Sequence, residues 1–251
     1  MGRRAREARG TYVAYLDDDL EVDPTWLASL FRACEVKKPD FCCGPIYSLF
    51  RVPKPYWFRE EWEMFGYLGD TPHQTDETVY DGNLAVRREL LTELGGFREN
   101  FGMSGQKIAY GEETDFHSRA KRAMPNLVVW YIPTASVHHE VAPVKFVISR
   151  RLRSAWAGGR DCFYLGMWKE ALRSRPRVAV RLAKETLVLA SRCLCVVGIM
   201  LADLFRPSRS KWRRFVQEAM IKHVVALSAY YHALRQPPED ADKAGDGPSL
   251  G

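Results

Sequence analysis

Short apolar runs of strand length alternate with helical patterns over the first half of this chain, and that alternation constrains its fold most strongly. Strands are predicted over residues 11–16, 40–47, 82–86 and 127–132. Helices are predicted over residues 23–36, over 88–94 and from Gly111 onward, and residues 48–80 are predicted to form a long irregular loop. The order of strands and helices indicates an α/β layer with a partly parallel sheet.

Helix boundary signals support this division. Asp23 followed by Pro24 is typical of an N-cap with proline at the first helical position. Gly95 and Gly96 follow the second predicted helix, as residues that close a helix do.

The chain changes character after Pro143, because no further strand pattern follows. Helices are predicted over residues 143–156, 176–205 and 211–234, and the composition of residues 236–251 predicts a disordered tail. We therefore expect an α/β domain over residues 1–144, a basic helical region over 145–235, and the tail over 236–251.

The net charge of +6 comes from one region of the chain. Residues 145–235 hold nineteen Lys and Arg against five Asp and Glu, whereas the regions on either side are acidic. Basic residues that alternate with long apolar runs favour an anionic membrane surface as partner and argue against nucleic acid.

Residues 186–205 are long enough to cross a bilayer, but Arg192 lies within them. A charge in the middle of a span costs about 2.5–3.5 kcal/mol on insertion scales. Two interpretations stay open: an interfacial helix on the membrane, and a helix packed on the α/β part.

Six cysteines without paired spacing are expected to be reduced thiols. The basic start of the chain is followed by an apolar run too short for a secretion signal. We therefore expect a cytoplasmic protein at the inner face of the plasma membrane.

Three aspartates, Asp17, Asp18 and Asp19, follow the first predicted strand. Ligands of open α/β sheets bind beyond the carboxyl ends of the strands, and two carboxylates there can share one divalent cation that holds a diphosphate. The alternative is a solvated acidic turn before the next helix.

Two further clusters carry ionisable groups. Glu112, Glu113 and Asp115 lie in the first turn of the helix that follows Gly111. One of these carboxylates is a candidate general base. The alternative is that they only stabilise the helix, because negative charge is favourable at its N-terminus. His138 and His139 follow the last predicted strand and are candidate metal ligands, although such histidines are often structural.

Taken together, five stretches resemble family 2 glycosyltransferases of the GT-A fold. They are ARGTYVAYLDDDLEVDPTWLASL, DGNLAVRRELLTELGGF, GEETDF, HHEVAPVKF and RRLRSAWAGGR. The resemblance covers about residues 8–160 and implies inverting, metal-dependent transfer of a sugar from a nucleoside-diphosphate donor to a hydroxyl of a glycan or lipid-linked acceptor.

The resemblance also implies roles for individual residues. Asp19, Asp17 and His139 would hold Mn2+ or Mg2+, with Asp17 also near the ribose and Asp18 beside the donor. Glu113 would be the catalytic base, assisted by Glu112 and Asp115 in the same motif. Gly82 and Asn83 would lie under the sugars. Four aromatic residues are candidate stacking surfaces for sugars, or else packing residues: Trp26, Trp57, Trp62 and Tyr80.

The family normally has several strand–helix units before its first aspartates, and only sixteen residues precede Asp17 here. We therefore expect an incomplete sheet and weak binding of nucleotide sugar by the chain alone. The alternatives are a catalytically dead remnant of a glycosyltransferase and a membrane-surface binding module. Metal-dependent phosphoryl transfer is a weaker alternative, because the sequence has no glycine-rich phosphate loop.

Overall fold

The computed structural model describes residues 7–77, 82–98, 101, 108–167, 174–205 and 211–235. The chain forms two compact units, an α/β unit and a helical unit. The α/β unit comprises Met1–Pro53, Arg59–Glu99 and Glu112–Ala142, and the helical unit comprises Lys54–Phe58, Asn100–Gly111 and Pro143–Gly251. A mixed α/β layer followed by helices is what the sequence predicts. The predicted tail, residues 236–251, lies outside the described residues.

The main sheet of the α/β unit has five strands in the order β1-β6-β3-β7-β5. Their bounds are β1 Tyr12–Leu16, β6 Asn83–Arg87, β3 Phe41–Cys43, β7 Val129–Tyr131 and β5 His73–Thr75. β1, β3 and β7 run in one direction, and β6 and β5 run against them. The carboxyl ends of β1, β3 and β7 therefore meet the start of β6 at one edge of the sheet.

A second, smaller sheet has the order β2-β8-β4. It consists of β2 Leu20–Val22, β8 Val137–Glu140 and β4 Ile46–Leu49, and a short 3-10 helix, η1 Glu60–Glu63, follows in the chain. The prediction of one strand over residues 40–47 is therefore wrong, because β3 and β4 belong to different sheets. Gly44 and Pro45 separate them, and a Cβ on Gly44 would lie 2.0 Å from the carbonyl oxygen of Ala135.

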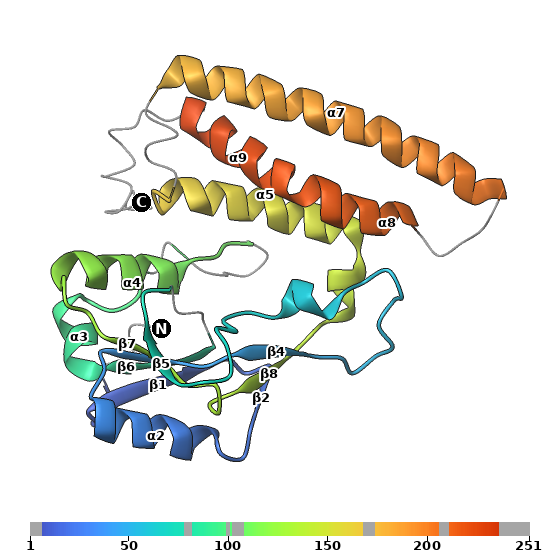
Figure 1. Ribbon diagram of the computed structural model, residues 1–251. Coiled ribbons are helices and arrows are strands. Elements are labelled where there is room, and N and C mark those ends of the chain that lie inside the picture. Colours follow the sequence, from blue (N-terminus) through green and yellow to red (C-terminus); the bar gives the residue numbers. More distant parts are fainter. Residues whose placement is uncertain are drawn as a thin grey trace. The chain divides into compact units, whose positions relative to one another are not determined.

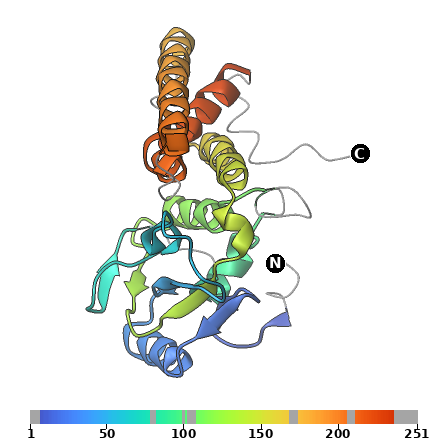
Figure 2. The same cartoon turned by 90° about the vertical axis from the view of Figure 1, so that its right-hand side faces the viewer.

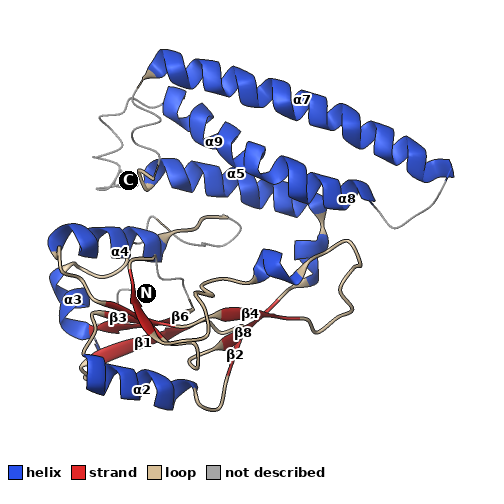
Figure 3. Cartoon of the chain, viewed as in Figure 1, coloured by secondary structure: helices blue, strands red, loops and turns tan. Residues whose placement is uncertain are grey.

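Helices cover both faces of the main sheet (Figures 1 and 3). Helix α2, Trp26–Lys37, packs on one face, and helices α3, Arg88–Glu93, and α4, Glu112–Ala123, pack on the other. Phe41 and Cys43 of β3 belong to the core under α3 and α4, while Cys42 between them belongs to the core under α2. This alternation is the period of two expected for a strand that is buried on both faces.

The helix boundaries confirm one prediction and correct another. Gly95 and Gly96 end α3 with φ angles of 72° and 71°, the left-handed conformation that glycine adopts without strain. Helix α2 begins at Trp26 with Thr25 as its N-cap, so the predicted cap at Asp23 is wrong. Asp23 Oδ1 instead accepts hydrogen bonds from the backbone N–H and the hydroxyl of Thr25, at 2.8 and 2.7 Å, in a turn before the helix.

The described part of the helical unit is built mainly from the long helices α5, α7 and α9, and Figure 2 views this unit from the side. Its elements are η2 Pro143–Phe146, α5 Ile148–Tyr164, α7 Arg175–Phe205, α8 Lys211–Phe215, a π-helical turn η3 Val216–Met220, and α9 Ile221–Arg235. The helix predicted over residues 143–156 is therefore a 3-10 turn followed by α5, which continues to Tyr164. Helix α9 packs against both α5 and α7.

The packing of α5 on α9 depends on a glycine. A Cβ on Gly159 would lie 2.1 Å from the carbonyl oxygen of Val225, so the two backbones approach more closely than a side chain allows. Nearby, the Ser228 hydroxyl donates to the carbonyl oxygen of Trp156 at 2.6 Å and fixes the same crossing.

Candidate active site

Asp17 lies at the exit of β1, beside the first residues of β6. Gly82 has a φ of 82°, and a Cβ at this position would lie 2.8 Å from Asp17 Oδ2. A larger residue would therefore meet both an unfavourable backbone conformation and the carboxylate. The close approach holds the Asp17 carboxylate against the start of β6.

Asp19 faces His139 on the second sheet. The His139 Nε2 lies 3.1 Å from Asp19 Oδ2, and the Glu140 backbone N–H donates to the Asp19 carbonyl oxygen at 3.2 Å. The Asp19 side chain is 53% exposed and that of His139 is 18% exposed. A ligand can reach this pair from solvent. The backbone hydrogen bond between Glu140 and Asp19 keeps the two side chains next to each other.

The two adjacent histidines point to different surroundings. The ring of His138 contacts that of Tyr47 in a tilted arrangement with the centroids 5.7 Å apart, whereas His139 pairs with Asp19. The structure therefore places His139, and not His138, beside Asp19.

The proposed metal set of Asp19, Asp17 and His139 is assembled only in part. Over the described residues, no three His, Cys, Asp or Glu side chains come together as a metal site. The chain turns at Asp18 and Asp19 between β1 and β2, so Asp17 lies against Gly82 while Asp19 lies against His139. Asp18, between them, is exposed.

The remaining pair fits a divalent cation chemically. Carboxylate and imidazole are both ligands of Mn2+, and carboxylate is a ligand of Mg2+. The 3.1 Å between Asp19 Oδ2 and His139 Nε2 is a direct hydrogen bond, and a bound cation would take the place of this contact.

Trp26 and Asn83 form a buried hydrogen-bond network next to this edge. Asn83 is 1% exposed and Trp26 is 6% exposed. The Trp26 indole N–H donates to Asn83 Oδ1 at 2.8 Å, and Asn83 Nδ2 donates to the carbonyl oxygens of Pro45 and Ala135 at 3.1 and 2.8 Å. Both side chains, predicted to contact substrate, have their polar groups occupied in the core.

The other aromatic candidates differ in burial. Trp57, in the helical unit, is 1% exposed, and Trp62 is half-buried. Tyr80 lies outside the described residues.

The first turn of α4 carries Glu112, Glu113 and Asp115. Glu113 is 9% exposed and Glu112 is half-buried. Asp115 is 6% exposed and forms ion pairs with Arg119 at 2.8 Å and Arg98 at 3.5 Å. Two guanidinium groups hold the Asp115 carboxylate in place, which suits it to positioning this turn.

Arg119 is a residue that sequence reasoning missed. Besides Asp115, its guanidinium donates to the carbonyl oxygens of Leu94 and Gly96, both at 2.6 Å. It thus ties α4 to the end of α3. The signal was present in the sequence, because Asp115 and Arg119 have the i,i+4 spacing of a helical ion pair.

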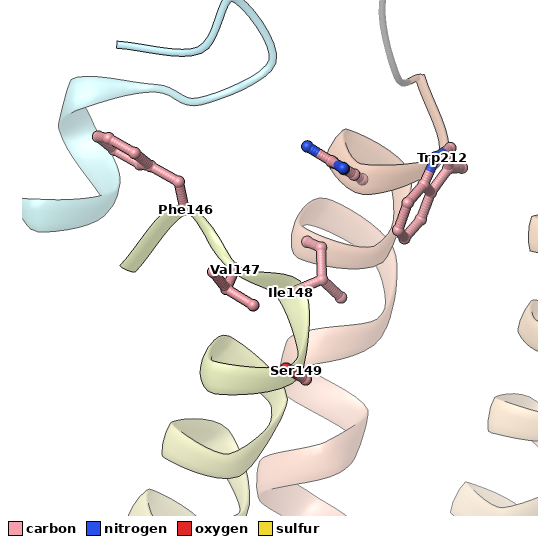
Figure 4. Close-up of a pocket in the computed structure, with 6 residues that line it drawn as sticks. Phe146, Val147, Ile148, Ser149 and Trp212 are labelled. Carbon is pink, nitrogen blue, oxygen red and sulfur yellow. The ribbon is translucent and has the colours of Figure 1, made fainter. Parts of the chain in front are cut away.

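A hollow in the helical unit has a volume of about 250 Å³ (Figure 4). It is lined by Phe146, Val147, Ile148, Ser149, Trp212 and Arg213. These residues include no carboxylate and no histidine, so the hollow lacks the groups of the candidate site.

Comparison with known proteins agrees with the sequence motifs. Residues 3–95 match the family model of glycosyl transferase family 2. This stretch holds the aspartates, Gly82 and Asn83, and the match confirms the resemblance to family 2 glycosyltransferases.

Two curated relatives are similar in sequence. One is the succinoglycan biosynthesis protein ExoM of Rhizobium meliloti, 27% identical over 84% of this chain and 63% of its own length. Another is the glucosyl-dolichyl phosphate glucuronosyltransferase of Haloferax volcanii, 26% identical over 59% of this chain and 49% of its own length. The chain thus spans about half to less than two thirds of the length of these relatives.

Among solved structures, the crystal structure of GalNAc-T7 with UDP, GalNAc and Mn2+ aligns with this chain. The alignment has a TM-score of 0.41 at 12% identity and covers 96% of this chain and 43% of that one.

Proposed function

We propose that this chain, whose residues 3–95 match family 2 glycosyltransferases, transfers a sugar from a nucleoside-diphosphate donor to an acceptor hydroxyl with inversion. The observation that carries the proposal is the Asp19–His139 pair, whose side chains are 3.1 Å apart and 53% and 18% exposed, near the edge where Asp17 meets Gly82. Carboxylate and imidazole at this edge suit a diphosphate held through a divalent cation.

Asp19 and His139 would hold Mn2+ or Mg2+. When bound, such an ion neutralises the charge that develops on the leaving diphosphate. Asp17, set against Gly82, accepts a hydrogen bond from a hydroxyl of the donor ribose, and Asp18 stays in solvent beside the donor.

Glu113 is the proposed general base. Its carboxylate accepts the proton of the acceptor hydroxyl as the hydroxyl oxygen forms a bond to the anomeric carbon. The bond from that carbon to the diphosphate oxygen breaks, and the electron pair leaves with the nucleoside diphosphate. Attack opposite the leaving group inverts the anomeric centre.

Glu112, next to the base, orients the acceptor. Asp115 does not contact the acceptor and instead positions Glu113. Its ion pairs with Arg119 and Arg98 fix the turn that bears Glu113. The names of the two curated relatives refer to a polysaccharide and to a lipid-linked sugar, which supports a glycan or a lipid-linked sugar as the acceptor.

The proposal is tested by donor turnover in the full chain. UDP-glucose, UDP-galactose and dTDP-rhamnose are supplied with Mn2+ and octyl β-glucoside, and release of nucleoside diphosphate and glycoside product is measured. Glu113→Gln is expected to lower turnover about 100-fold or more. Asp19→Asn is expected to raise the Mn2+ concentration needed for half-maximal rate.

Glu35→Gln is the control, because it removes one carboxylate charge from an exposed position of α2 in the same unit. It is expected to keep both the rate and the Mn2+ dependence. Turnover that is unchanged in Glu113→Gln and Asp19→Asn would refute these site assignments.

We further propose that the helical unit binds an anionic membrane surface and that the protein works in the cytoplasm at the inner face of the plasma membrane. Nineteen basic against five acidic residues over 145–235 support the membrane partner. All six cysteines are free thiols, which suits a reducing compartment.

Flotation with vesicles of neutral and of anionic phospholipid tests the membrane proposal. Binding is expected only to anionic vesicles and is expected to fall between 50 and 500 mM salt, because screening weakens attraction to head groups. Gel shift with double-stranded DNA is expected to show no specific complex. Equal binding to both vesicles at high salt would contradict an electrostatic contribution.

A further inference from the structure

Over residues 185–203, helix α7 separates its charged residues from its exposed apolar residues. Its residues 175–203 are long and apolar enough to cross a membrane, with a mean hydropathy of 1.8 in the most apolar window, none of which is buried. Val180, Leu187, Leu194 and Leu201 follow at intervals of seven residues and are 70%, 71%, 74% and 54% exposed. At about 100° per residue they form one continuous stripe.

From residue 185 onward, the charged residues of α7 lie on the side of the helix opposite the stripe. Glu185, Arg192 and Asp203 are seven and eleven residues apart, which is close to two and three whole turns. They are half-buried, whereas the stripe is exposed. Glu185 pairs with His223 of α9 at 2.6 Å, and the Arg192 guanidinium lies over the Phe215 ring at 5.8 Å.

Two hydroxyl groups on the exposed side are satisfied within the helix. Thr186 donates to the carbonyl oxygen of Leu182, and Ser191 donates to that of Val188, both at 2.8 Å. Residues 186–202 therefore present a side without a charged group, because Arg192 is the one charged residue among them and faces the bundle.

Basic residues lie at the N-terminal end of this apolar stripe. The first turns of α7 carry Arg175, Arg177, Arg181 and Lys184. A lipid bilayer with anionic head groups complements both the apolar stripe and these cations.

We propose that α7 lies in the plane of an anionic bilayer, with the stripe of Val180, Leu187, Leu194 and Leu201 in the boundary between head groups and acyl chains. This inference rests on the membrane association proposed above and specifies the face and the orientation. Helix α9 stays packed behind α7, so the Glu185–His223 pair remains out of the lipid. Spanning would detach α7 from α9 and expose Glu185 and Arg192 to hydrocarbon, which is strongly unfavourable.

A charge in the stripe tests the face. Leu194→Asp is expected to lower the partition coefficient for anionic vesicles by at least about tenfold, since it removes an inserted leucine and adds repulsion. Leu27→Asp, at a 66% exposed leucine of α2 in the other unit, is the matched control and is expected to keep binding. Because both side chains are exposed, circular dichroism and thermal unfolding without lipid should match the unaltered protein.

The outcomes separate this inference from the membrane proposal on which it rests. Loss of binding in Leu194→Asp alone supports α7 as the inserted face. Undiminished binding in Leu194→Asp refutes that face while leaving electrostatic membrane association intact. A stable dimer without lipid that Leu194→Asp dissociates would show that a second copy covers the stripe, and would overturn the inference.

Labelling tests the orientation. In a Cys193→Ser, Cys195→Ser background, Arg177→Cys and Ala202→Cys each place a thiol at one exposed end of α7. A membrane-impermeant maleimide added outside the vesicles after binding is expected to label both ends equally. Protection of one end until the vesicles are lysed would demonstrate a span and overturn the in-plane orientation.

Discussion

Replacing Asn83 by alanine should unfold the α/β unit more readily, and the structure gives the size of the effect. The change removes the acceptor for the Trp26 indole N–H and the donor for the carbonyl oxygens of Pro45 and Ala135. Each buried polar group left without a partner costs about 1–3 kcal/mol. Because Asn83 is 1% exposed, water cannot readily replace the lost hydrogen bonds. The free energy of unfolding should therefore fall by roughly 3–5 kcal/mol.

Urea unfolding followed by tryptophan fluorescence measures this loss. With a slope of about 1–3 kcal/mol per molar urea, the midpoint should fall by roughly 2 M. Trp26→Phe removes only the indole donor, and in combination with Asn83→Ala it should give a coupling energy of about 1–2 kcal/mol.

The same variant separates a structural Asn83 from a substrate-binding one. Under conditions where Asn83→Ala is still folded, the apparent affinity for donor should stay close to that of the unaltered chain. A variant with unchanged stability and a strongly raised KM for donor would refute our interpretation of the network.

Three further predictions concern other parts of the α/β unit. Gly82→Ala should disturb Asp17 and lower donor affinity about tenfold or more in calorimetric titration, because its Cβ would lie 2.8 Å from the carboxylate; unchanged affinity would contradict the close approach. Arg119→Met should cost about 3 kcal/mol of unfolding free energy in urea, because it leaves Asp115 buried with one weaker partner; a loss below 1 kcal/mol would show that this link is dispensable. Burial lowers the pKa of His117 to about 4, so the folded state stays neutral where the unfolded state gains a proton. Stability should therefore be complete above about pH 6.5 and fall by about 3 kcal/mol towards pH 4, and His117→Phe should flatten this dependence in urea unfolding across that range.

The sequence predicts the longer strands and helices of this fold because their hydrophobic pattern or their boundary residues are recognisable. The strand at Tyr12–Leu16 and the helix ended by Gly95 and Gly96 are confirmed. Strands β2 and β8 contain three and four residues, too few for a period to appear. These two strands depend on pairing with each other and with β4. Such pairing is tertiary information that a local pattern does not carry.

The candidate site shows the same limit at the level of single residues. Asp17 and Asp19, at i and i+2, would share one side if the strand continued, and this spacing suggested a shared cation. The chain instead turns at Asp18 and Asp19, so one carboxylate meets Gly82 and the other meets His139, 120 residues away. Which of two nearby carboxylates reaches a distant histidine depends on sheet pairing, in this case that of β2 with β8.

Arg192 shows how a structure can sharpen a sequence observation. Read along the sequence, a charge within residues 186–205 argues against a span, because every residue of an isolated helix in a membrane faces hydrocarbon. In the bundle, α8 and α9 take up one side of α7, and Arg192 and Glu185 lie on that side. The charge therefore argues against a span by α7 alone and is compatible with a helix whose opposite side contacts the bilayer. The segment thus has the amphipathic division that an interfacial helix requires.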